Sequence, residues 1–377
     1  MIFGSLRTLG FRNLADAEVD TAGKDVFLVG ENGQGKTNFL EAVYCCSYAS
    51  SFRGVPDAEV VREGEQAYAV SARFTGSAAG DESAGRLYEQ VRVTYERPKK
   101  TVYLDGKRLE DRSELLAVAP CIVFCHEDIE FVTGSLERRR WFFDQTLSLT
   151  DPDYLEDLRR YRKALKTRNT LLKTSTTGTS ILPLLDALDP QLAFYGIKLM
   201  EKRREAAAGF SSTFSALYEQ VADLDKLGVW YAPSWKEMTL EETGRWLAEH
   251  RERDMAAGLT LSGPHRDRYR FIRGASDFSG KASTGQRRLL ALLLRVAQAR
   301  RFSEIRGTYP VLLLDDVLLE LDPEKRRKFL EALPAYEQAF FTFLPEEPYY
   351  RYRKSHAIVY HVSQGFFSLF ALSPNAK

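Results

Sequence analysis

A glycine-rich stretch carries the residues whose types and spacing point most directly to chemistry. It fits the pattern G-x-x-x-x-G-K-[ST] and consists of Gly30, Glu31, Asn32, Gly33, Gln34, Gly35, Lys36 and Thr37. Glycines let the backbone curl with its N–H groups pointing inward, which suits a phosphate group, and a following helix adds its positive end. The pattern assigns Lys36 to the β- and γ-phosphates of a nucleotide and the Thr37 hydroxyl to Mg²⁺. A glycine-rich surface turn is the alternative, and the strand and helix patterns on either side argue against it.

Two carboxylates follow a run of four large apolar residues later in the chain. The run is Val311 to Leu314, and Asp315 and Asp316 come directly after it. A continuous apolar run suits a strand buried on both faces. Two acidic groups at its end would be costly unless a cation or a proton transfer used them. We therefore expect Asp315 to bind Mg²⁺ through water. We expect Asp316 to position or activate an attacking water, which makes it a catalytic residue together with Lys36.

A third motif precedes an apolar helix pattern. Ser283-Thr284-Gly285-Gln286 stands directly before that pattern. Ser283 suits a helix N-cap, and Gly285 leaves room for the close approach of a phosphate. A simple capped helix would be preferred for this tetrapeptide taken alone. A role in nucleotide binding is what a resemblance implies, because ABC ATPases carry their signature motif at this position relative to Asp315.

The elements that must position these motifs follow from hydrophobic periodicity and turn signals. Strands are predicted over 2–9, 17–19, 25–29, 67–74, 87–95, 101–104 and 310–314. Helices are predicted over 38–48, 155–173, 190–221 and 283–301, and the whole pattern from about 137 to 250 is helical. The two long helices, joined by residues 174–180, predict a short helical arm. The order strand, loop, helix around Gly30 to Thr37 is the context that the first motif requires.

The chain is long for one compact domain, at 377 residues. We predict an α/β fold in which a mixed sheet surrounds the phosphate-binding loop and a mainly helical second lobe is inserted. The nucleotide-binding lobe is expected to be discontinuous, over residues 1–120 and 263–377. The helical lobe with its short arm is expected over residues 121–262.

Composition excludes several classes of protein. The formal net charge is only +1, so any contact with nucleic acid must come from a local basic patch. The four cysteines include no Cys-x-x-Cys pair, and a zinc site built on Cys121, Cys125 and His126 would lack an evident fourth ligand. The N-terminus does not read as a signal peptide, and no stretch approaches the roughly 18 apolar residues of a membrane helix. We expect a soluble, cytoplasmic protein.

The motifs, in this order, resemble the ABC-type ATPase head that SMC and RecF proteins share. Further segments narrow the resemblance to the RecF family and cover nearly the whole chain. They are Arg12-Asn13-Leu14, residues 124–128, residues 134–140 with Asp144, Ser262 to Asp267, which is similar to SGPHRDD, and Leu312 to Asp322, which is similar to LLLDDVLSELD. The chain departs from the family pattern in three places: His126 replaces a proline, Arg268 an aspartate and Leu319 a serine. Thr342 stands near the position where transporter subunits carry a switch histidine, which argues against a transporter.

The resemblance implies a function and a set of partners. It implies ATP and Mg²⁺ as cofactors, weak ATPase activity used as a conformational switch, and an ATP-dependent homodimer. In such dimers Ser283, Gly285 and Gln286 of one subunit would meet the nucleotide on the other, and Arg12 would also contact nucleotide. The dimer would clamp double-stranded DNA beside single-strand gaps. It would act with RecR and RecO to load RecA in DNA repair and replication restart. Another SMC-like ATPase or a transporter-type subunit is the alternative.

A dense set of basic residues supports contact with DNA. The candidate DNA-binding residues are Arg138, Arg139, Arg140, Arg159, Arg160 and Lys163, and Arg168 belongs to the same basic stretch. Phosphate neutralisation by such groups would be salt-sensitive and largely independent of sequence. A solvated helical face with i,i+4 ion pairs remains an equal alternative for any one of them. Arg139 and Arg140 could instead be buried ion-pair partners of Asp144.

Overall fold

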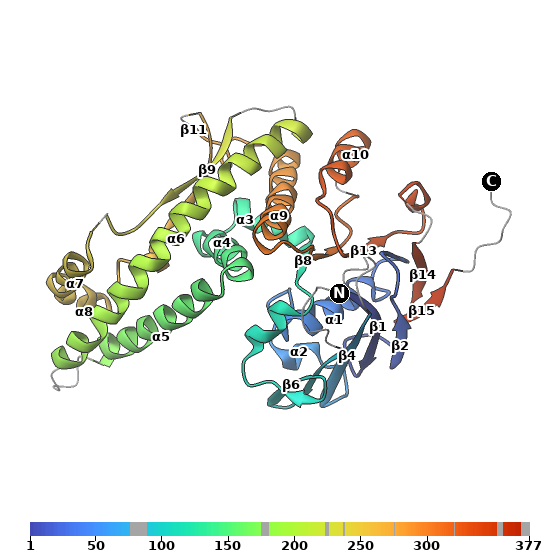
Figure 1. The fold of residues 1–377 in the computed structure, drawn as a ribbon, viewed down its shortest axis with the longest axis horizontal. Helices are drawn as coiled ribbons and strands as arrows, with labels where there is room; N and C mark the ends of the chain where they lie inside the picture. The colour runs from blue at the N-terminus through green and yellow to red at the C-terminus, as the bar shows by residue number, and fades with distance from the viewer. Residues whose placement is uncertain are drawn as a thin grey trace. The chain divides into compact units, whose positions relative to one another are not determined.

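The computed structural model describes residues 1–75, 89–174, 181–222, 226–236, 238–274, 276–319, 321–352 and 357–370 (Figure 1). The chain divides into two compact units. Unit 1 comprises Met1–His126, Arg306–Asp322 and Leu333–Lys377, and unit 2 comprises Glu127–Ile305 and Pro323–Ala332. Within the described ranges, no helix combines the length and the apolar character that crossing a membrane requires.

A mixed six-stranded sheet in unit 1 holds the phosphate-binding loop. Its order is β15-β14-β3-β13-β12-β8, formed by Phe366–Leu369, Ile358–Ser363, Asp25–Val29, Gln338–Phe343, Val311–Leu314 and Cys121–Phe124. All pairs are parallel except β14 with β15. Every residue of β3, β8, β12 and β13 is buried, as expected for parallel strands covered on both faces. The predicted mixed sheet around the loop is confirmed.

A second six-stranded sheet in unit 1 is antiparallel. Its order is β2-β1-β4-β5-β6-β7, formed by Ala17–Asp20, Ile2–Leu9, Ala67–Thr75, Gln90–Glu96, Lys99–Leu104 and Lys107–Arg108. Inward-facing residues of β1, β2, β4, β5 and β6, such as Val70, Val93 and Val102, pack into one core with α1 (Lys36–Tyr48). The remaining residues form the opposite face of the sheet. Short helices α2 (Asp57–Val60) and η1 (Arg112–Ala117) complete this part of unit 1.

Unit 2 is built on two long helices, α5 (Pro152–Thr174) and α6 (Leu182–Ala222), which run side by side (Figure 1). The predicted helical arm is therefore present, and most of its predicted tip, residues 175–180, lies outside the described residues. The other helices are α3 (Glu130–Thr133), α4 (Leu136–Thr150), α7 (Leu240–Glu249), α8 (Arg251–Ala257), α9 (Thr284–Arg306) and α10 (Pro323–Ala332). Short 3-10 helices cover His126–Ile129, Pro264–Arg266 and, in unit 1, Tyr349–Arg351.

The second boundary between the units differs from the predicted one. A small sheet, β11-β10-β9, joins Ser276–Asp277, Arg268–Arg273 and Leu227–Ala232. Strand β9 lies inside the segment whose pattern is helical throughout, and β10 pairs with it along its whole length. This pairing places residues 263–305, and with them Ser283 and α9, in unit 2 rather than in the nucleotide-binding lobe.

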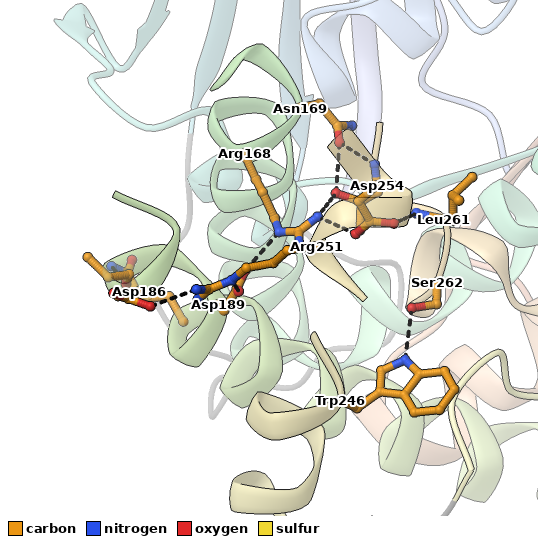
Figure 2. A network of polar contacts seen from close by, with 12 residues as sticks. Arg168, Asn169, Asp186, Asp189, Trp246, Arg251, Asp254, Leu261 and Ser262 are labelled. Atoms are coloured by element: carbon orange, nitrogen blue, oxygen red, sulfur yellow. Dashed lines mark hydrogen bonds and ion pairs between the residues drawn. The ribbon is translucent and has the colours of Figure 1, made fainter. Parts of the chain in front are cut away.

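A buried ion-pair network ties the elements of the arm together (Figure 2). The Arg168 side chain is fully buried, and its guanidinium donates to Asp189 Oδ1 at 2.7 Å, to Asp254 Oδ2 at 2.6 Å and to Thr260 Oγ1 at 2.8 Å. Arg251 donates to the other oxygen of Asp189 at 2.8 Å. The network thus connects α5, α6, α8 and the segment that follows α8. Because the Arg168 side chain is buried and paired, it does not belong to the basic residues that could support contact with DNA.

Candidate functional site

The phosphate-binding loop runs from the end of β3 to the start of α1. The Gly30 N–H donates to Phe343 O on β13 at 3.1 Å, which fixes the start of the loop. A Cβ atom at Gly30 would lie 2.3 Å from Val362 O, so no other residue fits there. Gly33 and Gly35 have φ angles of 79° and 112°, in the region that favours glycine. These glycines turn the chain sharply into α1, as the sequence motif predicts.

Lys36 lies inside the curl of the loop. Its Nζ donates to Gly30 O at 2.6 Å and to Glu31 O at 3.3 Å, and the residue is only 3% exposed. An ammonium group held by carbonyls of the loop stands where a phosphate enclosed by that loop would meet it. Glu31, Asn32 and Gly33, by contrast, are exposed at the outer side of the loop.

The Thr37 hydroxyl and the carboxylates that follow β12 lie next to each other. Thr37 Oγ1 donates to Asp315 Oδ1 at 2.8 Å and thereby links the start of α1 to the end of β12. The Asp316 N–H donates to Thr342 Oγ1 at 2.7 Å. Thr342 Oγ1 also lies 3.2 Å from Asp315 Oδ1 and 2.8 Å from Asp316 Oδ1. Three segments that are distant in sequence therefore meet at the carboxyl edge of the mixed sheet.

The carboxylate pair is poised for a cation. Burial and the neighbouring charge of Asp316 raise the pKa of Asp315 to about 7, and the Thr37 hydrogen bond opposes that rise. Two adjacent carboxylates that disfavour each other's negative charge are stabilised by a bound cation. A threonine hydroxyl and a carboxylate oxygen are hard ligands of the type that Mg²⁺ prefers. The donor set of Thr37 and Asp315 therefore fits Mg²⁺.

Hydrogen bonds from segments that are distant in sequence support the loop on both sides. Asn13 Nδ2 donates to Gly33 O at 2.9 Å, and Asn38 Nδ2 donates to Asn13 Oδ1 at 2.7 Å. On the other side, the Gly365 N–H donates to Gln34 O at 2.9 Å, and the Gln364 N–H donates to Gln34 Oε1 at 2.7 Å. The turn between β14 and β15 thus supports the loop, and the Gln-Gly dipeptide was the only local signal for that turn.

Glu41 is a further residue that the motifs missed. Its side chain is fully buried on α1, and it accepts from Arg12 Nε at 3.0 Å and Arg12 Nη2 at 2.9 Å. Ser51 Oγ also donates to it, and Arg53 Nη1 lies 3.6 Å away. The remaining Arg12 nitrogen, Nη1, donates to Glu59 O at 2.7 Å. Arg12, predicted to bind nucleotide, is therefore held by acceptors of the protein itself. The one feature of the sequence that could have indicated Glu41 is the presence of an acidic residue within an apolar helix pattern.

The predicted signature residues begin α9 in unit 2. The Ser283 N–H donates to Gln286 Oε1 at 2.9 Å, and the Gln286 N–H donates to Ser283 Oγ at 3.3 Å. This reciprocal pair is a capping box, so the predicted N-cap at Ser283 is confirmed. Ser283 and Gly285 are exposed, and nothing lies within 4 Å of where a Gly285 Cβ would be. The backbone at the start of α9 is therefore accessible to a ligand.

Two of the predicted DNA-binding arginines instead donate hydrogen bonds to backbone carbonyl oxygens within unit 2. Arg139 donates to Val132 O at 2.6 Å and Tyr269 O at 3.2 Å, and Arg140 donates to Asp267 O at 2.9 Å. Both side chains are half-buried, and burial lowers the pKa of each. Among the described residues, no ion pair joins either arginine to Asp144, which pairs with Arg203 at 2.7 Å and with Arg162 at 3.2 Å.

The other predicted DNA-binding residues are exposed. Arg138 pairs with Glu130 at 2.8 Å, and Arg160 pairs with Glu156 at 2.7 Å in the expected i,i+4 arrangement. Arg159 and Lys163 lie on the exposed side of α5. Exposed ion pairs are weak enough for a phosphate group to displace, so these positions stay predictions.

Comparisons with known proteins agree with this geometry. Residues 3–365 match the model of the family described as "RecF/RecN/SMC N terminal domain". The chain is 42% identical over 360 residues to the DNA replication and repair protein RecF of Treponema pallidum, covering 96% of this chain and 99% of that protein. It is 31% identical over 367 residues to the protein of the same name from Lachnoclostridium phytofermentans, covering 97% and 99%.

Solved structures are similar along the whole chain. One described as the recombination mediator protein RecF with ATP in the RecFOR pathway has a TM-score of 0.85 and 26% identity, covering 98% of this chain and 97% of that one. An Smc head bound to a winged-helix domain of ScpA has a TM-score of 0.54 and 14% identity, covering 99% and 98%. The latter likeness concerns the fold alone and agrees with an ABC-type ATPase head.

Proposed function

The chain belongs to the RecF family, and from that premise we propose that it is an ATP-dependent, DNA-binding mediator of recombination and repair. It binds ATP with Mg²⁺, forms a dimer on double-stranded DNA beside single-strand gaps, and hydrolyses ATP slowly to release that state. Through RecR and RecO it helps to load RecA. We expect it to act in the cytoplasm.

The contact between Thr37 and Asp315 is the observation that carries this proposal. It brings a hydroxyl and a carboxylate together beside the buried ammonium of Lys36, at the mouth of a loop whose backbone suits phosphate. Lys36 would exchange carbonyl oxygens of the loop for oxygens of the β- and γ-phosphates. Thr37 and Asp315 would hold Mg²⁺, which supplies neutralising charge at those oxygens. Asp316, fixed through Thr342, would orient the attacking water.

The start of α9 supports the proposal of a dimer. The exposed start of α9 offers Ser283 Oγ and open backbone at Gly285 to a nucleotide held by another subunit. ATP would then join two subunits through two equivalent sites.

Size-exclusion chromatography with light scattering, with and without ATP and Mg²⁺, tests the dimer. The mass should double with nucleotide, and Ser283→Arg should stay monomeric while it still binds ATP. An ATP-independent mass, or normal dimerisation of Ser283→Arg, would rule out this arrangement.

DNA binding is tested with fluorescently labelled gapped, duplex and single-stranded DNA. We expect ATP to tighten binding to the gapped and duplex forms, and Lys36→Met to abolish that effect. Equal affinity with and without ATP would contradict the proposed function.

A further inference from the structure

A row of arginines crosses the outward face of the antiparallel sheet in unit 1. Strand register places Arg7 opposite Ser71, Ser71 opposite Arg92, Arg92 opposite Tyr103, and Tyr103 opposite Arg108. Directly opposite residues of antiparallel strands project to the same face. The arginines of β1, β5 and β7 therefore stand in one line on one side of the sheet. We call Arg7, Arg92 and Arg108 the arginine row.

The fold does not use the arginine row. All three side chains are exposed, whereas the sequence neighbours Leu6, Val91 and Val93 are buried in the core on the other face. None of the three forms a hydrogen bond or an ion pair with a described residue. Three unpaired guanidinium groups in line are a local basic surface on a chain of nearly neutral net charge.

The spacing of the row suits a polyanion. Neighbouring strands lie about 4.8 Å apart, so arginines on alternate strands stand roughly 10 Å apart and the row spans about 19 Å. Further cations flank it, because Arg73 and Lys99 are also exposed on this face. Glu18 lies opposite Arg7 at one end, and Glu96 lies opposite Lys99. The acids stand at the margins, and the centre of the face, at Arg92, has no acidic neighbour directly across the strands.

The face is also hollowed beside the arginine row. A hollow of about 690 Å³ is lined by Ala69, Thr94 and Thr101, by the cations Arg97 and Lys99, and by the acids Asp16, Glu65 and Glu96, so its mixed charge suits a phosphate less well than the row does. An adjoining hollow of about 370 Å³ is lined by Gln90, Arg92, Thr94, Tyr103 and Gly106. Small side chains here let an extended backbone come close to the sheet while the arginines reach over it.

The chemistry of the face favours nucleic acid over an acidic protein. Phosphate contacts in protein–DNA complexes come from arginine together with serine, threonine, glutamine and tyrosine side chains, which are the residue types gathered here. Protein interfaces have an apolar core, and the apolar residues Leu9 and Ala69 on this face are few and only half-buried. We propose that the arginine row and the hollow that Arg92 lines bind the sugar-phosphate backbone of DNA. This inference rests on the proposed function and assigns to unit 1 a DNA surface separate from α5.

Salt-dependent DNA binding tests the proposal with the full-length protein, ATP and Mg²⁺. The variant Arg7→Gln/Arg92→Gln/Arg108→Gln should lose affinity for duplex DNA on the order of 100-fold at 0.1 M salt. The slope of log affinity against log salt should fall by about 3, because three phosphate contacts are lost. ATP binding should be unchanged, which shows that the variant is folded.

Two charge-matched variants make the test specific. Lys236→Gln/Arg245→Gln/Arg253→Gln removes three exposed cations from unit 2 and should bind DNA like the wild type. Arg159→Gln/Lys163→Gln/Lys166→Gln examines the competing surface on α5. Wild-type affinity and slope in the arginine-row variant would overturn this inference alone, as would an equal loss in the unit 2 control. A wild-type protein that binds no DNA would overturn the proposed function as well.

Discussion

Glu41 organises the positive charges beside the phosphate-binding loop. Its buried carboxylate receives the Arg12 guanidinium through two nitrogens and lies 3.6 Å from Arg53. Arg53 also donates to Asn38 on α1 at 3.2 Å. One acid thus holds two arginines that come from separate loops. Arg53 is close enough to the carboxylates after β12 to lower the pKa of Asp315.

Replacing Glu41 should therefore cost stability. Glu41→Gln keeps the shape of the side chain but leaves two arginines without their buried counter-charge. We expect a loss of about 2 kcal/mol or more in the free energy of unfolding, measured by urea denaturation. ATP affinity should also fall as the loop loses its bracing.

The exposed pair of Arg160 and Glu156 provides the control. Glu156→Gln removes a charge from a solvated ion pair on α5 and should cost less than about 1 kcal/mol. If the two substitutions have the same small effect, Glu41 does not have the structural role assigned to it.

At this scale the sequence predicted the residues that belong to local patterns. Lys36, Thr37 and Asp315 stand at motif positions, and the structure brings them together. Glu41 and the turn at 364–365 could not be predicted in the same way, because their importance comes from hydrogen bonds between distant segments. The isolated side-chain types carry no sign of these partners.

Elements were predicted well where periodicity is strong and flanked by turn signals. Strands β1 and β3 and helix α5 occur within a few residues of their predicted ranges. Strand β9 was missed because it is short, follows a 41-residue helix and pairs with a strand about forty residues further on. Because β10 pairs with β9, it belongs to unit 2, and the observed boundary between the units therefore differs from the predicted one.

The contribution of the Arg168 network to the stability of the helical arm can be tested by substitution. Arg168→Met should destabilise unit 2 by about 3–5 kcal/mol, because Asp254 is then left buried without its counter-charge. Hydrogen exchange should show faster exchange over the start of α6 and over α8, which the network connects to α5 (Figure 2).

Two further variants separate loss of charge pairing from loss of packing. Arg159→Met lies on the exposed side of the same helix and should change stability by about 0.5 kcal/mol or less. Adding Asp254→Asn to Arg168→Met should recover part of the loss, since it removes the uncompensated charge. No recovery would show that the ion pair is not the source of the effect.

For the whole molecule, the proposed cycle separates nucleotide binding from hydrolysis. Asp316→Asn removes the carboxylate assigned to water but keeps Thr37 and Asp315. ATP turnover should fall by roughly 100-fold or more, while the nucleotide-dependent dimer persists or becomes longer-lived. Phosphate-release assays and light scattering on the same sample measure both quantities.

Asp315→Asn is the matched comparison. It removes the charge proposed to hold Mg²⁺ and should lose turnover and dimerisation together. Wild-type turnover in Asp316→Asn would require a different residue to position the water.

The strand order of the mixed sheet has a consequence for how the protein is made on the ribosome. Strand β3 leaves the ribosome early, yet its neighbours β13 and β14 come from residues 338–363, and the turn that supports the loop follows them. At usual rates of translation this delay is on the order of tens of seconds. A nascent chain, or a product truncated before residue 338, therefore cannot assemble the loop. The proposed nucleotide binding would therefore be a property of chains synthesised beyond this region, and shorter products would lack it.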